Sequence, residues 1–195
     1  MAGYSIEVRT TSSPSCHESP FATVLIAWAV LARVVPETRG RPGDVMDVAG
    51  PVLAFFQVFS RWSCFSAGCC HGKPAYGLPW AVLFRHPRTH CIYRGIPVHP
   101  TQLYLSVGNL ALLVVLLALW RRPWFRGRLV WVYLAGYGLL RLAVEFYRGD
   151  VRPMVGALSI YQVICLVYIA AGGAALLRAC LRGRQGTAAS AASPA

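Results

Sequence analysis

The chain has 195 residues, of which 56% are hydrophobic and 13% are charged, and its mean hydropathy is +0.49. Soluble domains average roughly 45–50% apolar and about 25% charged residues, so this composition excludes an ordinary soluble domain, and its apolar content excludes a disordered or collagen-like chain. The net charge of +12 comes mostly from arginines between apolar stretches. This distribution fits anionic lipid or a topology signal better than nucleic acid. We therefore expect a membrane protein that does not bind nucleic acid.

Hydrophobic stretches predict five membrane-spanning helices, at residues 21–35, 47–60, 102–120, 129–147 and 158–177. Residues 1–20 are polar and turn-rich and predict a flexible arm, whereas residues 179–195 predict a disordered cytoplasmic tail. Residues 21–178, between these two segments, are the predicted membrane domain. The expected fold class is an all-α polytopic membrane protein with one long irregular segment, residues 61–101, on its outer face.

Arginine-rich segments predict how these helices are oriented. Positive charge near a membrane marks the cytoplasmic side, and clusters occur at residues 33–41, 121–128 and 178–184. Five spans of alternating direction place all three clusters on the cytoplasmic side. They also bring residues 61–101 and 148–156 to the same outer face. We therefore expect a functional site there, built from segments that are distant in the sequence.

Two ionisable residues, Arg141 and Glu145, lie four positions apart within the predicted span 129–147. Charged groups inside a span are costly and usually face a cavity or a partner. One interpretation is an ion pair that only holds the helices together. The other is that Arg141 binds an anionic lipid head group while Glu145 orients it, because the planar guanidinium donates two parallel hydrogen bonds to phosphate.

Arg61 begins a segment rich in cysteine and glycine, and it is either an interfacial arginine whose charge extends to water or part of a phosphate site. Cys64, Cys69, Cys70 and His71 are residue types that bind zinc, but their spacing is poor for one tetrahedral site. A tight turn of close-packed small residues is the favoured explanation, and a disulfide on an oxidising face is the alternative. We therefore expect no bound metal.

The run His99-Pro100-Thr101-Gln102-Leu103-Tyr104 begins the clearest predicted helix. Threonine is a fair N-cap and proline is common near a helix start, so a capping role explains part of this pattern. His99 and Tyr104 are also a proton acceptor and a proton donor at the outer water–lipid boundary. We therefore include both as candidate catalytic residues.

Three segments together resemble the prolipoprotein diacylglyceryl transferase family. The arginine-led glycine and cysteine signature of that family is similar to SRWSCFSAGCCHGKPAYGLPWAVLF, residues 60–84. Its second motif is similar to HPTQLY, residues 99–104, and its third to RLAVEFYRGD followed by GALSIYQ, within residues 141–162. The order and spacing of the motifs agree, and the resemblance runs from about residue 21 to residue 178.

The resemblance implies a multi-pass enzyme of the bacterial inner membrane with its active face towards the periplasm. Such enzymes transfer the diacylglyceryl group of phosphatidylglycerol to the lipobox cysteine thiol of preprolipoproteins, and no cofactor is expected. The expected partners are phosphatidylglycerol, the lipobox peptide and membrane lipid. The candidate catalytic residues are Arg141, Glu145, His99 and Tyr104, and the candidate substrate-binding residues are Arg61, Cys64, Gly72, Gln102 and Arg148.

Departures from the family pattern keep two other functions open. Family members usually have seven spans, whereas this sequence predicts five, and the family's His-Gly-Gly element is represented at best by His17-Glu18-Ser19. Leu105 replaces the glutamate that commonly follows HPTQLY. The first alternative is a non-catalytic relative that binds phospholipid or the lipobox peptide. The second is a metal- or thiol-dependent membrane protein built around the cysteines and His71.

Overall fold

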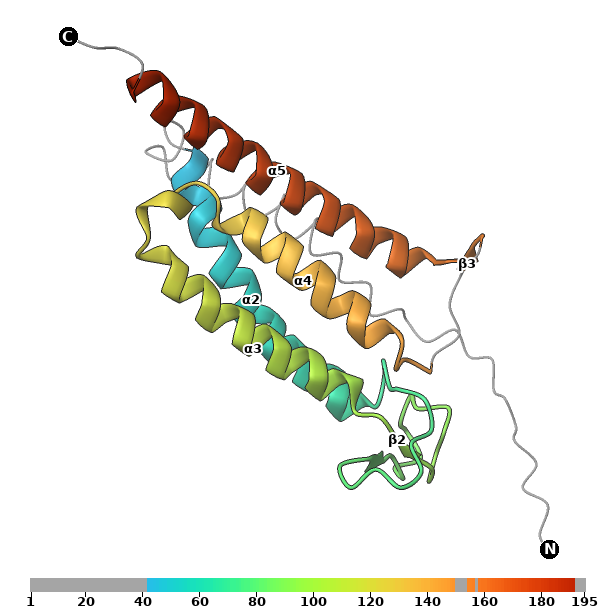
Figure 1. The fold of residues 1–195 in the computed structure, drawn as a ribbon. Helices are drawn as coiled ribbons and strands as arrows, with labels where there is room; N and C mark the ends of the chain where they lie inside the picture. The colour runs from blue at the N-terminus through green and yellow to red at the C-terminus, as the bar shows by residue number, and fades with distance from the viewer. Residues whose placement is uncertain (1–41, 150–153, 157, 192–195) are drawn as a thin grey trace, which may run out of the picture.

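The computed structural model describes residues 42–149, 154–156 and 158–191. The predicted arm at residues 1–20 and the predicted span at residues 21–35 lie outside this part of the chain. Its long elements are the helices α2 (Pro42–Ala67), α3 (Thr101–Trp120), α4 (Leu129–Glu145) and α5 (Ile160–Ala191). A short 3-10 helix, η2 (Pro123–Phe125), joins α3 to α4 (Figure 1). The mostly helical fold agrees with the predicted class.

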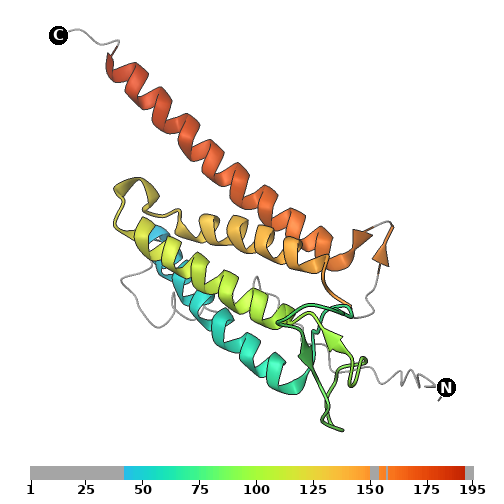
Figure 2. The same cartoon turned by 60° about the horizontal axis from the view of Figure 1, so that its bottom comes forward.

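Helices α2, α3 and α4 lie lengthwise beside one another in both views, and α5 starts beside α4 and diverges from it towards its C-terminal end in Figure 2. Helix α2 packs against α3 and α4, and α4 packs against α5. The buried apolar cluster between them comprises Leu53, Ala54, Leu116, Leu129, Val130, Tyr133, Leu134, Tyr137 and Tyr168. Large apolar side chains such as Phe56, Val107 and Leu139 are instead exposed on the outside of the bundle. An apolar outer surface of this kind is expected where helices face lipid.

Two of these helices are long and apolar enough to cross a membrane, namely Thr101–Trp120 and the part of α5 from Ile160 to Gly183. Helices α2 and α4 coincide with the predicted spans at 47–60 and 129–147, but the described residues do not confirm five spans. Helix α5 continues to Ala191, through residues that we expected to form a disordered tail. Alanine and arginine, which are frequent there, favour helix.

Helix α2 is longer than predicted and ends at Ala67 because of a glycine stop signal. The Gly68 N–H donates to the Phe65 carbonyl and the Cys69 N–H to the Cys64 carbonyl, both at 3.1 Å, which is the Schellman pattern. Gly68 has a φ of +70°, and a Cβ there would collide with the Thr89 hydroxyl. The start of the predicted irregular segment is therefore helical, and it carries Arg61 on α2.

Two short antiparallel sheets complete the described part of the fold. Strand β1 (Val82–Leu83) pairs with β2 (Pro97–Val98), with Val82 opposite Val98, in the segment between α2 and α3. Strand β3 (Met154–Val155) pairs with β4 (Leu158–Ser159) and leads directly into α5. Both sheets lie at the same end of the helix bundle (Figure 2).

Asp47 connects α2 to the start of α4 at the opposite end of the bundle. Its buried carboxylate accepts hydrogen bonds from the N–H of Gly127 at 2.5 Å and from the N–H of Leu129 at 3.1 Å. The first N–H groups of a helix have no partner within the helix, so this carboxylate satisfies that of Leu129, the first residue of α4, and also fixes the turn at Gly127 before it. We expect Asp47→Ala to lower the free energy of unfolding by about 1–3 kcal/mol. Thermal unfolding in detergent micelles measures this change.

The control for this prediction is Asp47→Asn. It keeps one carbonyl oxygen as an acceptor and should lose less stability than Asp47→Ala. Equal melting temperatures for Asp47→Ala and the parent chain would show that the two hydrogen bonds do not contribute.

Candidate active site

The predicted site residues lie at the end of the bundle where α2 and α4 end and where α3 and α5 begin (Figure 1). Backbone pairing joins the three motif segments at this end. The Gly72 N–H donates to the His99 carbonyl at 3.0 Å, and the Lys73 N–H donates to the Tyr147 carbonyl at 2.8 Å. Gly72 and Arg148 also form an antiparallel bridge. The expectation that these distant segments come together is therefore confirmed.

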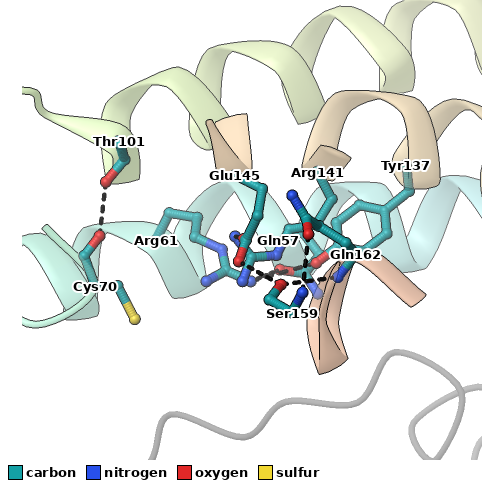
Figure 3. A network of polar contacts seen from close by, with 9 residues as sticks. All are labelled: Gln57, Arg61, Cys70, Thr101, Tyr137, Arg141, Glu145, Ser159 and Gln162. Carbon is teal, nitrogen blue, oxygen red and sulfur yellow. Dashed lines mark hydrogen bonds and ion pairs between the residues drawn. The ribbon is translucent and has the colours of Figure 1, made fainter. Parts of the chain in front are cut away.

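Arg61 lies near the end of α2 and is only 6% exposed. Its Nη2 donates to Gln57 Oε1 at 3.0 Å and contacts the Tyr137 hydroxyl of α4 at 3.5 Å (Figure 3). Both of these partners are neutral, so they position the guanidinium without cancelling its charge. This burial does not fit an interfacial arginine that extends its charge to water.

Arg141 and Glu145 form the ion pair that their spacing predicts. Arg141 Nη1 lies 3.4 Å from Glu145 Oε2, and their side chains are 11% and 4% exposed. The other carboxylate oxygen accepts a hydrogen bond from Ser159 Oγ at 3.3 Å, and the Arg141 guanidinium lies 5.7 Å from the centre of the Tyr161 ring. The pair on α4 is therefore held against the start of α5 (Figure 3).

Ser159 and Gln162 hold the start of α5 in a reciprocal capping arrangement. The Ser159 N–H donates to Gln162 Oε1 at 2.9 Å, and the Gln162 N–H donates to Ser159 Oγ at 3.2 Å. This is the capping box of a Ser-x-x-Gln sequence. The same Ser159 hydroxyl donates to Glu145, so the cap also positions the ion pair. Sequence reasoning missed this role, although a Ser-x-x-Gln pattern before an apolar run was a signal for it.

Arg148 adds a third guanidinium to this end of the bundle, and it is 6% exposed. Its charge acts on the thiol of Cys70 and on the guanidinium of Arg61, so these three groups lie close together. Among the side chains that the structure describes, Glu145 is the carboxylate that contacts this group. Three guanidinium groups and one carboxylate at this end of the bundle leave a surplus of positive charge. Such a surplus suits an anionic ligand.

Two candidate substrate-binding residues have positioning contacts in the structure. A Cβ on Gly72 would lie 2.5 Å from the Cβ of His99 and 2.8 Å from the Tyr147 carbonyl oxygen, so this position has room only for glycine. Gln102 is 1% exposed and donates from Nε2 to the Cys69 carbonyl at 2.7 Å. Both residues therefore hold the motif segments in place.

The candidate catalytic residues His99 and Tyr104 contact each other through their polar groups. The His99 Nδ1 lies 3.2 Å from the Tyr104 hydroxyl oxygen, which also accepts a hydrogen bond from Trp80 Nε1 at 2.9 Å. Because Trp80 can only donate, Tyr104 is free to donate its own proton to His99. The ring of Tyr147 packs against both, with centroids 5.3 Å from His99 and 6.3 Å from Tyr104.

The cysteine side chains lie closer together than their spacing in the sequence indicated. The sulfur atoms of Cys64, Cys69 and Cys70 all lie within 4.8 Å of one another, so the argument against a shared thiol site was wrong. The turn at Gly68 and a φ of +61° at Cys70 bring the chain back over the end of α2. Hydrogen bonds with Cys64 and Cys69, and the charge of Arg148, lower the pKa of the Cys70 thiol, whereas burial opposes this shift.

His71 does not join these thiols. Its Nε2 accepts a hydrogen bond from the Ile92 N–H at 3.3 Å, and its Nδ1 lies 3.1 Å from the Gly72 carbonyl oxygen. The ring is 2% exposed and packs edge-on against Tyr93. Both ring nitrogens are therefore used by the backbone, and His71 is a structural residue of the loop.

The fold and the site together define a class of protein. It is a helical membrane protein with a cluster of buried arginines, one of them paired with a glutamate, at one end of its bundle. The sequence profile of the prolipoprotein diacylglyceryl transferase family matches residues 19–178, so the chain belongs to that family.

Curated relatives carry the name phosphatidylglycerol–prolipoprotein diacylglyceryl transferase. The chain is 40% identical to that of Clostridium tetani over 128 residues, which are 66% of this chain and 50% of the relative. It is 36% identical to that of Thermosynechococcus vestitus over 144 residues, which are 72% of this chain and 53% of the relative. The chain thus spans about half the length of the curated relatives it matches.

Proposed function

We propose that this chain transfers the diacylglyceryl group of phosphatidylglycerol to the lipobox cysteine thiol of preprolipoproteins. The observation that carries the proposal is that three arginines and Glu145 lie at one end of the bundle, where Arg61 and Arg148 are buried and Arg141 pairs with Glu145. A phosphodiester is the anion that fits this surplus charge, and the names of the relatives supply the lipid and the protein acceptor. The protein is a multi-pass protein of the bacterial inner membrane, and its active face is towards the periplasm.

The reaction forms one bond and breaks another. The acceptor sulfur forms a bond to the terminal glyceryl carbon, and the bond from that carbon to the phosphate oxygen breaks. Its electron pair leaves with glycerol phosphate, and the thiol proton passes to a base. Arg141 and Arg61 stabilise the charge that develops on the leaving phosphate, because buried guanidinium groups act strongly where little water competes. Glu145 orients Arg141, and Arg148 and Gln102 help to bind the substrates.

We assign the proton transfer to His99 and Tyr104. In the tautomer of His99 that leaves Nδ1 without a proton, the Tyr104 hydroxyl donates to Nδ1 and can in turn accept the thiol proton, so the pair relays it to the imidazole. We expect Tyr104→Phe to lower the transfer rate about a hundredfold, as for loss of a general base. Steady-state transfer measured across pH is the check. A rate and pH profile equal to those of the parent would exclude the relay.

The test of the function is transfer of labelled diacylglyceryl from phosphatidylglycerol to a lipobox peptide. Membranes that contain the chain should label the peptide, and a peptide whose cysteine is replaced by serine is the control. Complementation of a strain depleted of its own transferase tests the same activity in cells. Failure of both would overturn the proposal.

A non-catalytic relative is the second candidate, because Leu105 stands where the family motif commonly has a glutamate. It predicts binding of phosphatidylglycerol without transfer. Loss of that binding in Arg61→Ala and Arg141→Ala, together with an inactive parent chain, would favour it.

A further inference from the structure

Three thiols converge close to Arg61 and Arg148, and one of them, Cys64, was expected to bind substrate. Cys64 lies in the last turn of α2, and Cys69 and Cys70 follow the turn at Gly68. Their sulfur atoms lie within 4.8 Å of one another. Zinc–sulfur bonds of about 2.3 Å in a tetrahedron require sulfur–sulfur distances of about 3.8 Å, so only a small adjustment separates this arrangement from a coordination site.

The backbone around the thiols is held firmly by helix α3. Thr101 Oγ1 donates to the Cys70 carbonyl at 2.6 Å, and Gln102 Nε2 donates to the Cys69 carbonyl at 2.7 Å. These contacts hold Cys70 at its φ of +61°, a conformation that costs free energy in a residue other than glycine. The strained position keeps its thiol with those of the other two cysteines.

We propose that Cys64, Cys69 and Cys70 form a three-thiolate site for a thiophilic ion of the zinc type. Thiolate sulfur selects such ions over magnesium or calcium. His71 is not a ligand, because the backbone uses both of its ring nitrogens. Three protein ligands leave the fourth tetrahedral position open for water or an incoming thiol, which is the arrangement of reactive rather than structural zinc sites.

The charges around the cluster suit this assignment. Three thiolates and one divalent zinc ion carry a net charge of −1. The positive charge of Arg148 acts on Cys70, and that of Arg61 acts on Cys64 and Cys70. Buried positive charge on two sides therefore balances the site.

The test is the metal content of the full chain. Cells are grown with zinc, and the protein is purified in detergent under reducing conditions and washed briefly with a chelator before the metal is measured. We expect about one zinc ion per chain. X-ray absorption at the zinc edge should show three sulfur ligands at about 2.3 Å and one lighter atom. This measurement uses the parent chain, so it does not depend on whether a variant folds.

Serine variants provide the second readout. Cys64→Ser, Cys69→Ser and Cys70→Ser should each lose most of the zinc and, after cobalt substitution, the sulfur-to-cobalt charge-transfer bands. Cys180→Ser removes an exposed cysteine of α5 and should keep both. Zinc below stoichiometric amounts in the parent, or zinc with only nitrogen and oxygen ligands, would overturn the proposal. A disulfide between two of the three cysteines would also overturn the proposal if its reduction did not restore zinc binding. Metal content is independent of transfer, so failure here is distinct from failure of the proposed function.

Discussion

Replacing Arg141 by alanine is expected to lower the transfer rate by at least about a hundredfold, because a charge-assisted donor to the leaving phosphate contributes about 3 kcal/mol or more in the transition state. The loss also leaves Glu145 buried without its ion-pair partner, since that carboxylate is only 4% exposed. Ser159 would still donate to it. The measurement is transfer of labelled diacylglyceryl to a lipobox peptide, with protein levels matched in the membranes.

Arg141→Lys is the matched control for charge. Lysine keeps the positive charge but lacks the planar fork that donates two parallel hydrogen bonds to phosphate. The variant should therefore be well below the parent in rate. Arg61→Ala should show a comparable loss, because its guanidinium is buried and held by neutral partners. Near-normal transfer by both alanine variants would refute the role of the arginines.

Gly72→Ala is expected to have the second largest effect, on stability and transfer together. The new Cβ would lie 2.5 Å from the Cβ of His99 and 2.7 Å and 2.8 Å from the carbonyl oxygens of His99 and Tyr147. Backbone atoms cannot move aside as a flexible side chain can, so we expect a loss of about 3 kcal/mol in the free energy of unfolding. Displacement of the motif segments should also slow transfer about a hundredfold.

Gly173→Ala is the control for this substitution. Gly173 lies in α5, and a Cβ there meets nothing within 4 Å. Alanine also favours helix over glycine by about 1 kcal/mol, so this variant should be as stable as the parent or slightly more stable. Unchanged melting temperature and transfer in Gly72→Ala would contradict the packing argument.

The sequence alone located much of the fold and part of the site. Apolar stretches predicted helices where α3 and α4 lie, because hydrophobicity along the chain is a local property. The four-residue spacing of Arg141 and Glu145 predicted their ion pair, because helix geometry places such positions on one face. The expectation that the segments around Gly72 and Arg148 would come together is confirmed, whereas the membrane orientation that the arginine clusters indicate stays a prediction.

Other features were decided only by tertiary structure. Gln57 and Tyr137 hold Arg61, and Ser159 holds Glu145, through contacts between helices whose packing no local pattern specifies. The thiols of the first motif converge because a Schellman turn and the hydrogen bonds from Thr101 and Gln102 fold the chain back on itself. Spacing along an extended sequence does not measure such distances. The local sequence pattern therefore predicted where the helices and the charged residues of the site lie. The packing of distant segments decided which of these side chains come into contact.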